Sequence, residues 1–315
     1  MTRSKKSLRL GTRASRLARI QTAWVMKELK KLDSSLDIKE TIISTKGDRD
    51  KSKPLRELGG DGLFVKELER ALLDGRVDLA VHSHKDVPAE QSEGLSIAAI
   101  PKRAPTGDLF VSRLYPTLDS CPPDTKVGTG SARRRVQLLW AAPNVEVVPI
   151  RGNLDTRLNK VREGVVDAII IAEAGLQRLG FETAQGLHVE PLRPNVMLPA
   201  AAQGALAIQI RSDDEFTRLL VEKINCSVSA DCVAAERAFL AGVGGGCHHP
   251  VGALAKNKKS GIHLQAMVAR DEDSFVVRLE ARQEKGETPA ELGFRLATDA
   301  KHWVGTVLKD GGSEQ

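Results

Sequence analysis

Leu8-Arg9-Leu10-Gly11-Thr12-Arg13-Ala14-Ser15 is the stretch that decides the fold, because it is typical of a short strand that turns sharply into a helix. The apolar residues predict a buried strand over residues 8–11, and Ser15 is a suitable N-cap for the helix that follows. A similar turn recurs as Gly128-Thr129-Gly130-Ser131-Ala132. Two similar α/β domains in succession explain this repeat of strand, polar turn and helix.

Strands and helices alternate through the first two thirds of the chain, which indicates an α/β fold. Apolar runs predict further strands over residues 38–44, 79–81, 95–100, 146–150 and 168–172. Apolar spacing predicts helices over residues 64–72, 133–140 and 153–163, and a first helix in which Leu17, Ile20, Trp24 and Leu29 recur at roughly helical spacing. The last third predicts an α+β domain, with helices over 213–225, 229–242 and 288–308 and strands over 251–255, 262–269 and 274–282.

Length and charge limit the classes of function. A chain of 315 residues favours two or three domains. The basic N-terminus lacks the apolar core of a secretory signal and no run is long enough to cross a membrane, so we expect a cytoplasmic protein with no membrane partner. The net charge of +6 is mild and aromatic residues make up only 3%, which favours a small polyanionic ligand over nucleic acid.

Basic residues recur where predicted strands turn into helices. These residues are Arg13, Arg133, Arg134, Arg151 and Arg157. A cation at a helix start opposes the helix dipole and costs some helix stability. Recurrence at this position therefore indicates anion contacts, since guanidinium groups bind carboxylates at two points. For any single one of them, a solvated surface arginine is the alternative.

Two further segments carry groups suited to chemistry. Val81-His82-Ser83-His84-Lys85-Asp86-Val87-Pro88 begins where an apolar strand ends, the place at which open α/β sheets bind ligands. Asp86 is a candidate functional carboxylate there, and a solvated ion pair with Lys85 is the alternative. No third metal ligand accompanies the histidines, so we expect no metal.

The second segment, Gly242-Val243-Gly244-Gly245-Gly246-Cys247-His248-His249-Pro250, presents a thiol on a glycine-rich loop. The four cysteines, Cys121, Cys226, Cys232 and Cys247, form no C-x-x-C pair, which argues against a redox motif or a structural zinc site. Cys247 is therefore a candidate attachment point for another group.

Ordered strings that match one family run from about Leu8 to the closing helix. They are Leu10-Gly11-Thr12-Arg13-Ala14-Ser15, Gly62-Leu63-Phe64-Val65-Lys66-Glu67-Leu68-Glu69, Lys85-Asp86-Val87-Pro88, Ser131-Ala132-Arg133-Arg134, Arg151-Gly152-Asn153, Thr156-Arg157-Leu158, Arg178-Leu179-Gly180, Leu198-Pro199-Ala200, Gln203-Gly204-Ala205 and Gly245-Gly246-Cys247. Together they resemble the porphobilinogen deaminase family, also called hydroxymethylbilane synthase.

The resemblance implies two α/β domains like those of type II periplasmic binding proteins, followed by a small C-terminal α+β domain. We expect a discontinuous first domain over residues 1–103 and 199–219, and a second domain over residues 108–197. A third domain over residues 221–315 would carry Cys247. A monomer is expected.

The resemblance also implies a transferase that joins four porphobilinogen molecules head to tail, releases ammonia and yields hydroxymethylbilane for tetrapyrrole biosynthesis. Its primer is a covalent dipyrromethane cofactor, one per chain, held by a thioether that falls on Cys247. The family's catalytic carboxylate falls on Asp86, which would stabilise the cation left when ammonia departs. At about 4 Å and an effective dielectric near 20, that attraction is roughly 4 kcal/mol.

Other residues receive roles by the same resemblance. Those expected at the cofactor are Lys85, Ser131, Arg133, Arg134 and Arg157, and those expected at the substrate or growing chain are Arg13, Arg151, Arg178 and Gln203. This chain departs from many relatives at Asp61, where they have a lysine, and its His84, His248 and His249 are unusual choices.

The sequence leaves two other functions open. A non-catalytic anion-binding receptor of the periplasmic-binding-protein type explains the α/β lobes and the arginines, but it gives no role to Cys247 or Asp86. A hydrolase with Cys247 as nucleophile and His248 or His249 as base lacks a third, orienting group.

Overall fold

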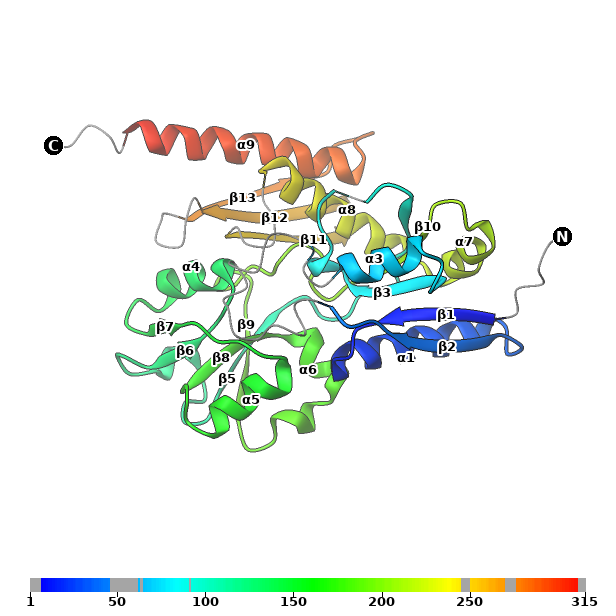
Figure 1. Ribbon diagram of the computed structural model, residues 1–315. Helices are drawn as coiled ribbons and strands as arrows, with labels where there is room; N and C mark the ends of the chain where they lie inside the picture. Colours follow the sequence, from blue (N-terminus) through cyan, green and yellow to red (C-terminus); the bar gives the residue numbers. More distant parts are fainter. Residues whose placement is uncertain are drawn as a thin grey trace. The chain divides into compact units, whose positions relative to one another are not determined.

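The computed structural model describes residues 7–45, 62, 65–90, 92–244, 250–269 and 276–310, with residues 303–310 described by their backbone alone. The chain divides into two compact units, one formed by Met1–Ala104 and Ala205–Ala230 and the other by Pro105–Gly204 and Asp231–Gln315. The elements of both units are labelled in Figure 1. The expected boundaries of three separate domains stay a prediction.

The first unit is built on a five-stranded sheet in the order β2-β1-β3-β10-β4. Its strands are β1 (Ser7–Thr12), β2 (Asp37–Ile42), β3 (Leu79–Ser83), β4 (Leu95–Ala99) and β10 (Leu206–Arg211). β1 is parallel to both β2 and β3, whereas β10 is antiparallel to β3 and β4. Because β1 and β3 are parallel, the chain leaves both strands at the same edge of the sheet.

The helices of this unit follow the predicted pattern with two corrections. They are α1 (Arg16–Leu32), α3 (Lys66–Leu73) and α7 (Glu215–Val221), with the 3-10 turns η1 (His84–Asp86) and η4 (Glu222–Ile224). Ser15 caps α1 as predicted, since its hydroxyl accepts a hydrogen bond from the backbone N–H of Ala18 at 3.3 Å. The apolar spacing of α1 is only partly confirmed, because Leu29 is fully buried together with Val25, whereas Trp24 is 39% exposed.

The second correction concerns the helix predicted over residues 213–225. It begins later because Asp214 acts as its N-cap, with the Asp214 side chain accepting from the N–H of Thr217. It also tightens into the 3-10 turn η4 at its end, where the N–H of Asn225 donates to the carbonyl of Glu222.

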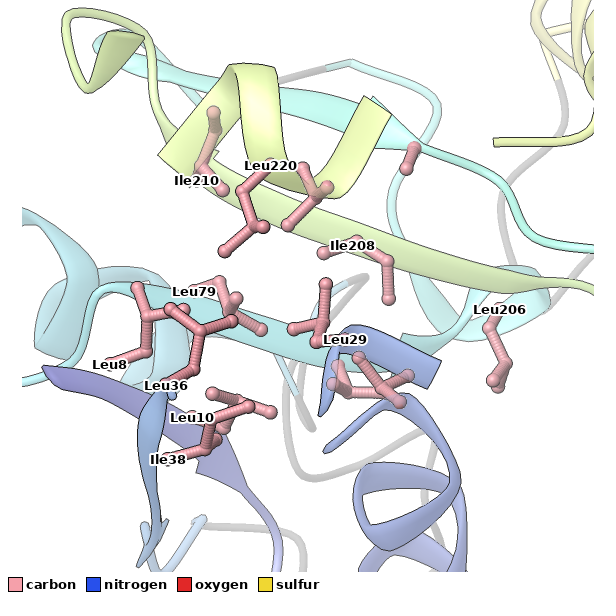
Figure 2. Close-up of a cluster of buried hydrophobic side chains, with 14 residues drawn as sticks. Leu8, Leu10, Leu29, Leu36, Ile38, Leu79, Leu206, Ile208, Ile210 and Leu220 are labelled. Carbon is pink, nitrogen blue, oxygen red and sulfur yellow. The ribbon is translucent and has the colours of Figure 1, made fainter. Parts of the chain in front are cut away.

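Apolar side chains from distant segments form the core of the first unit (Figure 2). Leu10 of β1, Leu79 of β3 and Ile208 of β10 are fully buried together with Leu29 of α1. Each such side chain contributes about 1.5–3 kcal/mol when it leaves water. The cluster therefore helps to hold β10 in the sheet, although β10 is far along the chain from the strands beside it.

The second unit contains a sheet with the same pattern, in the order β7-β6-β8-β5-β9. Its strands are β5 (Asp108–Ser112), β6 (Lys126–Gly128), β7 (Glu146–Val148), β8 (Ala168–Ala172) and β9 (His188–Leu192). β6 is parallel to β7 and β8, and β5 is antiparallel to β8 and β9. The helices are α4 (Ala132–Ala141), α5 (Leu154–Arg162) and α6 (Glu173–Leu179), with the 3-10 turns η2 (Leu118–Ser120) and η3 (Phe181–Ala184). This shared topology explains the repeated turn in the sequence.

The C-terminal part of the second unit is a three-stranded antiparallel sheet with two helices. Its elements are α8 (Ser227–Gly242), in which the chain enters this unit, β11 (Val251–Lys258), β12 (Gly261–Ala269), β13 (Val276–Arg282) and α9 (Pro289–Asp310), which lies along the sheet in Figure 1. Leu264 packs on one face of the sheet with Phe239 of α8 and Leu292 of α9, and Met267 packs on the other with Val136 of α4. The predicted fold class, two α/β parts and a C-terminal α+β part, is confirmed.

Close packing of α8 against α9 depends on Gly293. A Cβ at this position would clash with the carbonyl oxygen of Ala235 and would lie 2.8 Å from the backbone nitrogen of Phe239. We expect Gly293→Ala to lower the free energy of unfolding by about 1–3 kcal/mol, because the two backbones must separate. Urea unfolding measures this change. The exposed Thr298→Ala on the same helix is the control and should stay within about 0.5 kcal/mol of the parent. Equal stability of the two variants would contradict the close approach.

Candidate functional site

The carboxyl edge of the first sheet gathers Arg13, Lys85 and Asp86. Arg13 directly follows β1, and Lys85 and Asp86 lie in η1 directly after β3. All three are half-buried. Asp86 and Arg13 both act electrostatically on the buried His82, so the two groups lie near it. Among the described residues, none forms a hydrogen bond or an ion pair with the Asp86 carboxylate, which leaves its oxygens available to a ligand.

A buried polar chain lies beneath this edge. His82 Nε2 is 3.0 Å from Gln209 Oε1, and Gln209 Nε2 donates to the Glu69 carboxylate at 2.9 Å. Since the Gln209 amide donates to Glu69, its oxygen faces the histidine and His82 Nε2 must carry the proton. Burial lowers the pKa of His82 to about 4, against the opposing effect of the hydrogen bond that His82 donates to Gln209, so the ring is neutral at pH 7.

The corresponding edge of the second sheet gathers predicted residues from three turns. Ser131 is the N-cap of α4 after β6, yet its side chain makes no capping hydrogen bond. Arg151 and Arg157 follow β7, and Arg157 Nε donates to the carbonyl of Gly152 at 2.8 Å. Arg178 lies in α6 after β8. Because β6, β7 and β8 are parallel, these turns share one edge of the sheet.

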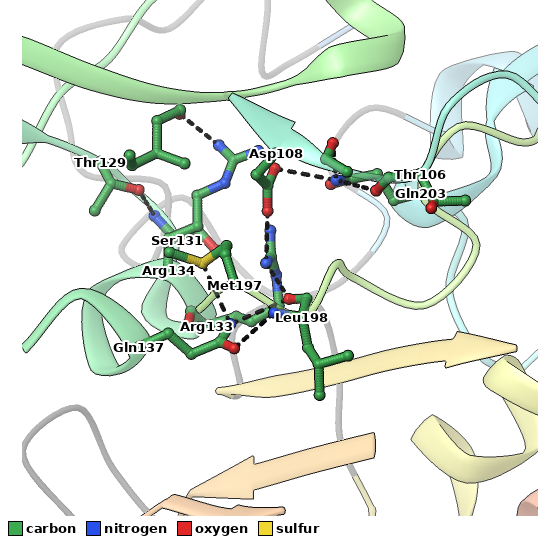
Figure 3. A network of polar contacts seen from close by, with 12 residues as sticks. Thr106, Asp108, Thr129, Ser131, Arg133, Arg134, Gln137, Met197, Leu198 and Gln203 are labelled. Carbon is green, nitrogen blue, oxygen red and sulfur yellow. Dashed lines mark hydrogen bonds and ion pairs between the residues drawn. The ribbon is translucent and has the colours of Figure 1, made fainter. Parts of the chain in front are cut away.

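Arg133 and Arg134 are buried in an ion cluster with Asp108, a residue that the sequence did not single out (Figure 3). Arg133 Nη1 lies 2.8 Å from Asp108 Oδ2, and Arg134 Nη2 lies 2.6 Å from Asp108 Oδ1. Burial would raise the pKa of Asp108, but attraction and hydrogen bonds from the two guanidinium groups outweigh it and hold this pKa far below its ordinary value. Asp108 is therefore charged at neutral pH.

Gln203 joins the same cluster from the segment before β10. Its Nε2 donates to Asp108 Oδ1 at 3.0 Å and to the carbonyls of Thr106 and Gly107. The preceding Ala202 has a φ of 60°, a left-handed conformation that is costly for a residue with a Cβ. Its N–H donates to the buried Glu236 carboxylate at 2.7 Å, which fixes this backbone and so the place of Gln203.

Two cations at this edge pair with no carboxylate among the described residues. Arg178 donates to the carbonyl of Gly204 at 2.7 Å, and burial alone lowers its pKa to about 10, which still leaves it charged at neutral pH. Arg151 Nη1 is buried without a hydrogen bond. Among the described residues no Asp or Glu forms an ion pair with either guanidinium. Buried charges of this kind favour an anionic ligand.

Several predicted residues lie outside the described part of the chain, namely Cys247, His248, His249 and Asp61. Sequence analysis missed Asp108 and Glu236, since a single acid at a strand start or inside a helix carries no distinguishing pattern. Within the described ranges, no set of three or more His, Cys, Asp or Glu is grouped to hold a metal ion. In the same ranges, no helix has both the length and the apolar character needed to cross a membrane.

Comparisons with known proteins decide the family. The family model for the porphobilinogen deaminase dipyrromethane cofactor binding domain matches residues 8–218, and that for the C-terminal domain of porphobilinogen deaminase matches residues 230–302. The chain belongs to the porphobilinogen deaminase family. The porphobilinogen deaminase of Listeria monocytogenes serotype 4a is 42% identical over 94% of this chain and 94% of its own. That of Streptococcus sanguinis is 41% identical over 93% of this chain and 96% of its own.

Membership of the porphobilinogen deaminase family confirms the predicted transferase, with porphobilinogen as substrate, hydroxymethylbilane as product and dipyrromethane as cofactor. The non-catalytic receptor is not favoured. Among solved structures, the methionine-binding protein MetQ is similar with 12% identity and a TM-score of 0.44, over 73% of this chain and 96% of its own.

The buried His82 generates a prediction about pH. Its pKa is 6.5 in the unfolded chain and about 4 in the fold, so unfolding takes up a proton between these values and stability falls as pH drops through this window. Across the whole window the loss is about 3 kcal/mol. Urea unfolding from pH 7 to pH 4 should show this loss in the parent, and His82→Gln should lack that component. Parallel pH profiles of the two proteins would contradict a buried neutral imidazole.

Proposed function

We propose that this chain builds hydroxymethylbilane on a dipyrromethane cofactor attached to Cys247, with Asp86 as the catalytic carboxylate. The observation that carries the proposal is positive charge at one edge of the second sheet that no described carboxylate pairs with. The half-buried Arg178 donates to a carbonyl rather than to a carboxylate, and the buried Nη1 of Arg151 has no hydrogen bond with the described residues. A substrate that brings an acetate and a propionate on each ring would neutralise such charges.

The donor chemistry of the residues proposed for the cofactor fits a dipyrromethane. Each of its two rings carries two carboxylates, and guanidinium, ammonium and hydroxyl groups are the donors that carboxylates accept. Lys85, Ser131, Arg133, Arg134 and Arg157 would hold those carboxylates. The unused hydroxyl of Ser131 at the start of α4 supports its inclusion, because helix starts also present free N–H groups to anions. When bound, the cofactor supplies the pyrrole carbon to which substrate is added.

Asp86 would act by electrostatic stabilisation. Its carboxylate is half-buried and carries no ion pair or hydrogen bond from the described residues, so it can face the positive charge that develops when ammonia leaves the substrate. It can also accept a hydrogen bond from a pyrrole N–H. The buried chain from His82 to Glu69 supports the strand that ends just before Asp86.

Arg13, Arg151, Arg178 and Gln203 would bind the substrate and the growing chain. Each added ring brings two more negative charges, which several cations would balance. We further propose a monomer in the cytoplasm that binds no nucleic acid, in line with the mild net charge of +6 and the 3% of aromatic residues. The division into domains over residues 1–103 with 199–219, 108–197 and 221–315 is also part of this proposal.

The attachment at Cys247 predicts a definite mass. Purified protein should be heavier than its sequence by two pyrrole units, and Cys247→Ser should lack this addition because no thioether can form. Intact-mass spectrometry makes the measurement. Cys226→Ser is the matched control and should keep the added mass. A fully active parent protein of unmodified mass would rule the attachment out.

The role of Asp86 predicts a loss of turnover without a loss of fold. Removing a preorganised electrostatic group costs on the order of 100- to 1,000-fold in kcat, so Asp86→Asn should lose that much porphobilinogen consumption. Its melting temperature should stay close to that of the parent, because no described residue pairs with this carboxylate. Glu90→Gln changes an exposed acid nearby and should remain active. Near-normal turnover by Asp86→Asn would show the assignment to be wrong.

A further inference from the structure

Asp108 occupies an unusual place for a carboxylate. It is the first residue of β5, which lies between β8 and β9, and it is 0% exposed. Burying a lone carboxylate costs several kcal/mol, so an aspartate persists here only with strong compensation. Its compensation consists of Arg133 and Arg134, two of the residues proposed to hold the cofactor.

The two arginines are consecutive residues of α4. Side chains of neighbouring residues in a helix point about 100° apart, so these two do not meet at one point by helix geometry alone. Asp108 brings them together, because Arg133 Nη1 reaches one of its oxygens at 2.8 Å and Arg134 Nη2 reaches the other at 2.6 Å. Each guanidinium is also fixed by a carbonyl, Arg133 by that of Leu198 and Arg134 by that of Ile170. Figure 3 shows both side chains turned toward the one carboxylate.

The cluster is not electrically neutral. Two guanidinium groups meet one carboxylate, and among the described residues no second Asp or Glu pairs with Arg133 or Arg134. Both arginines are nearly buried, at 4% and 6% exposure, so the surplus positive charge is poorly screened by water. A carboxylate of a ligand would complete the balance.

A second buried aspartate, Asp78, forms an ion cluster with a different ratio of arginines to aspartates. The Oδ1 atom of Asp78 lies 3.0 Å from Arg9 Nη2 and 3.5 Å from Arg211 Nη2. Arg211 Nη2 also lies 2.9 Å from Asp214 Oδ2. Among the described residues, two arginines therefore meet two aspartates there, so these ion pairs carry equal numbers of positive and negative charges. The surplus of positive charge distinguishes the Asp108 cluster from it.

We propose that Asp108 is a positioning residue of the reaction: it holds the guanidinium groups of Arg133 and Arg134 in the orientation that receives cofactor carboxylates, and it neutralises only one of the two charges. Gln203 supports it with a third hydrogen bond at 3.0 Å, so the segment before β10 is tied to the same point. The proposal rests on the proposed function, because it gives the two arginines their ligand.

The experiment compares Asp108→Asn with Asp78→Asn in the full-length protein. Both variants lose a buried ion pair and should have lower melting temperatures than the parent. Asp108→Asn alone should also lose cofactor, seen as a smaller fraction of chains with the added mass of two pyrrole units. In the chains that keep the cofactor, kcat for porphobilinogen should fall on the order of 100-fold, as expected when binding groups move by about 1 Å. Asp78→Asn should keep the cofactor and the parent's kcat.

Equal cofactor occupancy and equal kcat in the two variants would overturn the proposal, since Asp108 would then be only structural. Where Asp108→Asn does not fold, Asp108→Glu keeps the charge and displaces it by one methylene. It should fold yet bear less cofactor than the parent, and parent-like occupancy and kcat would equally overturn the proposal. Failure of the proposed function gives a different result, because the parent protein itself would then carry no pyrrole units and consume no porphobilinogen.

Discussion

Two guanidinium groups from consecutive residues share one buried carboxylate, and this ion cluster is the constraint on which the chemistry of the second unit depends. Arg133 and Arg134 belong to α4, Asp108 begins β5, and Gln203 comes from the segment that leads to β10. A buried charge without a partner would cost several kcal/mol. The fold therefore brings separate segments to one point, and the positive charge left over there is a physical reason for the protein to bind a carboxylate.

The repeated sheet topology explains where the other charged groups lie. In both units three parallel strands end at one edge, and an antiparallel strand separates them from the last strand. Turns that follow parallel strands are the usual ligand sites of open α/β sheets. The first unit places Asp86 and Arg13 after such strands, and the second places Arg151 after β7 and Arg178 in the helix that follows β8. Within the described ranges, the first unit thus presents a carboxylate that no cation pairs with, and the second presents cations that no carboxylate pairs with.

Much of this arrangement could be predicted from local sequence, because strand-to-helix turns carry short-range signals. The cap at Ser15 and the helix after Ser131 could be predicted from the residues next to them in the chain. β5 and β10 were missed, since short apolar runs carry no period and their partners lie far away in sequence. Trp24 shares the helical spacing of Leu29 yet is 39% exposed, because apolar spacing alone cannot say which side of the helix the sheet will cover. Asp108 was missed because its role depends on Arg133 and Arg134, which only the folded chain brings to it.

The central claim is that buried cations of the second unit are balanced by carboxylates of bound pyrroles. A crystal structure of the cofactor-bearing protein tests this most directly. The account predicts cofactor or substrate carboxylates within ion-pairing distance of Arg133, Arg134 and Arg178, with Asp108 still bound to the first two. Carboxylates that turn to solvent, with these guanidinium groups contacting only protein, would contradict it.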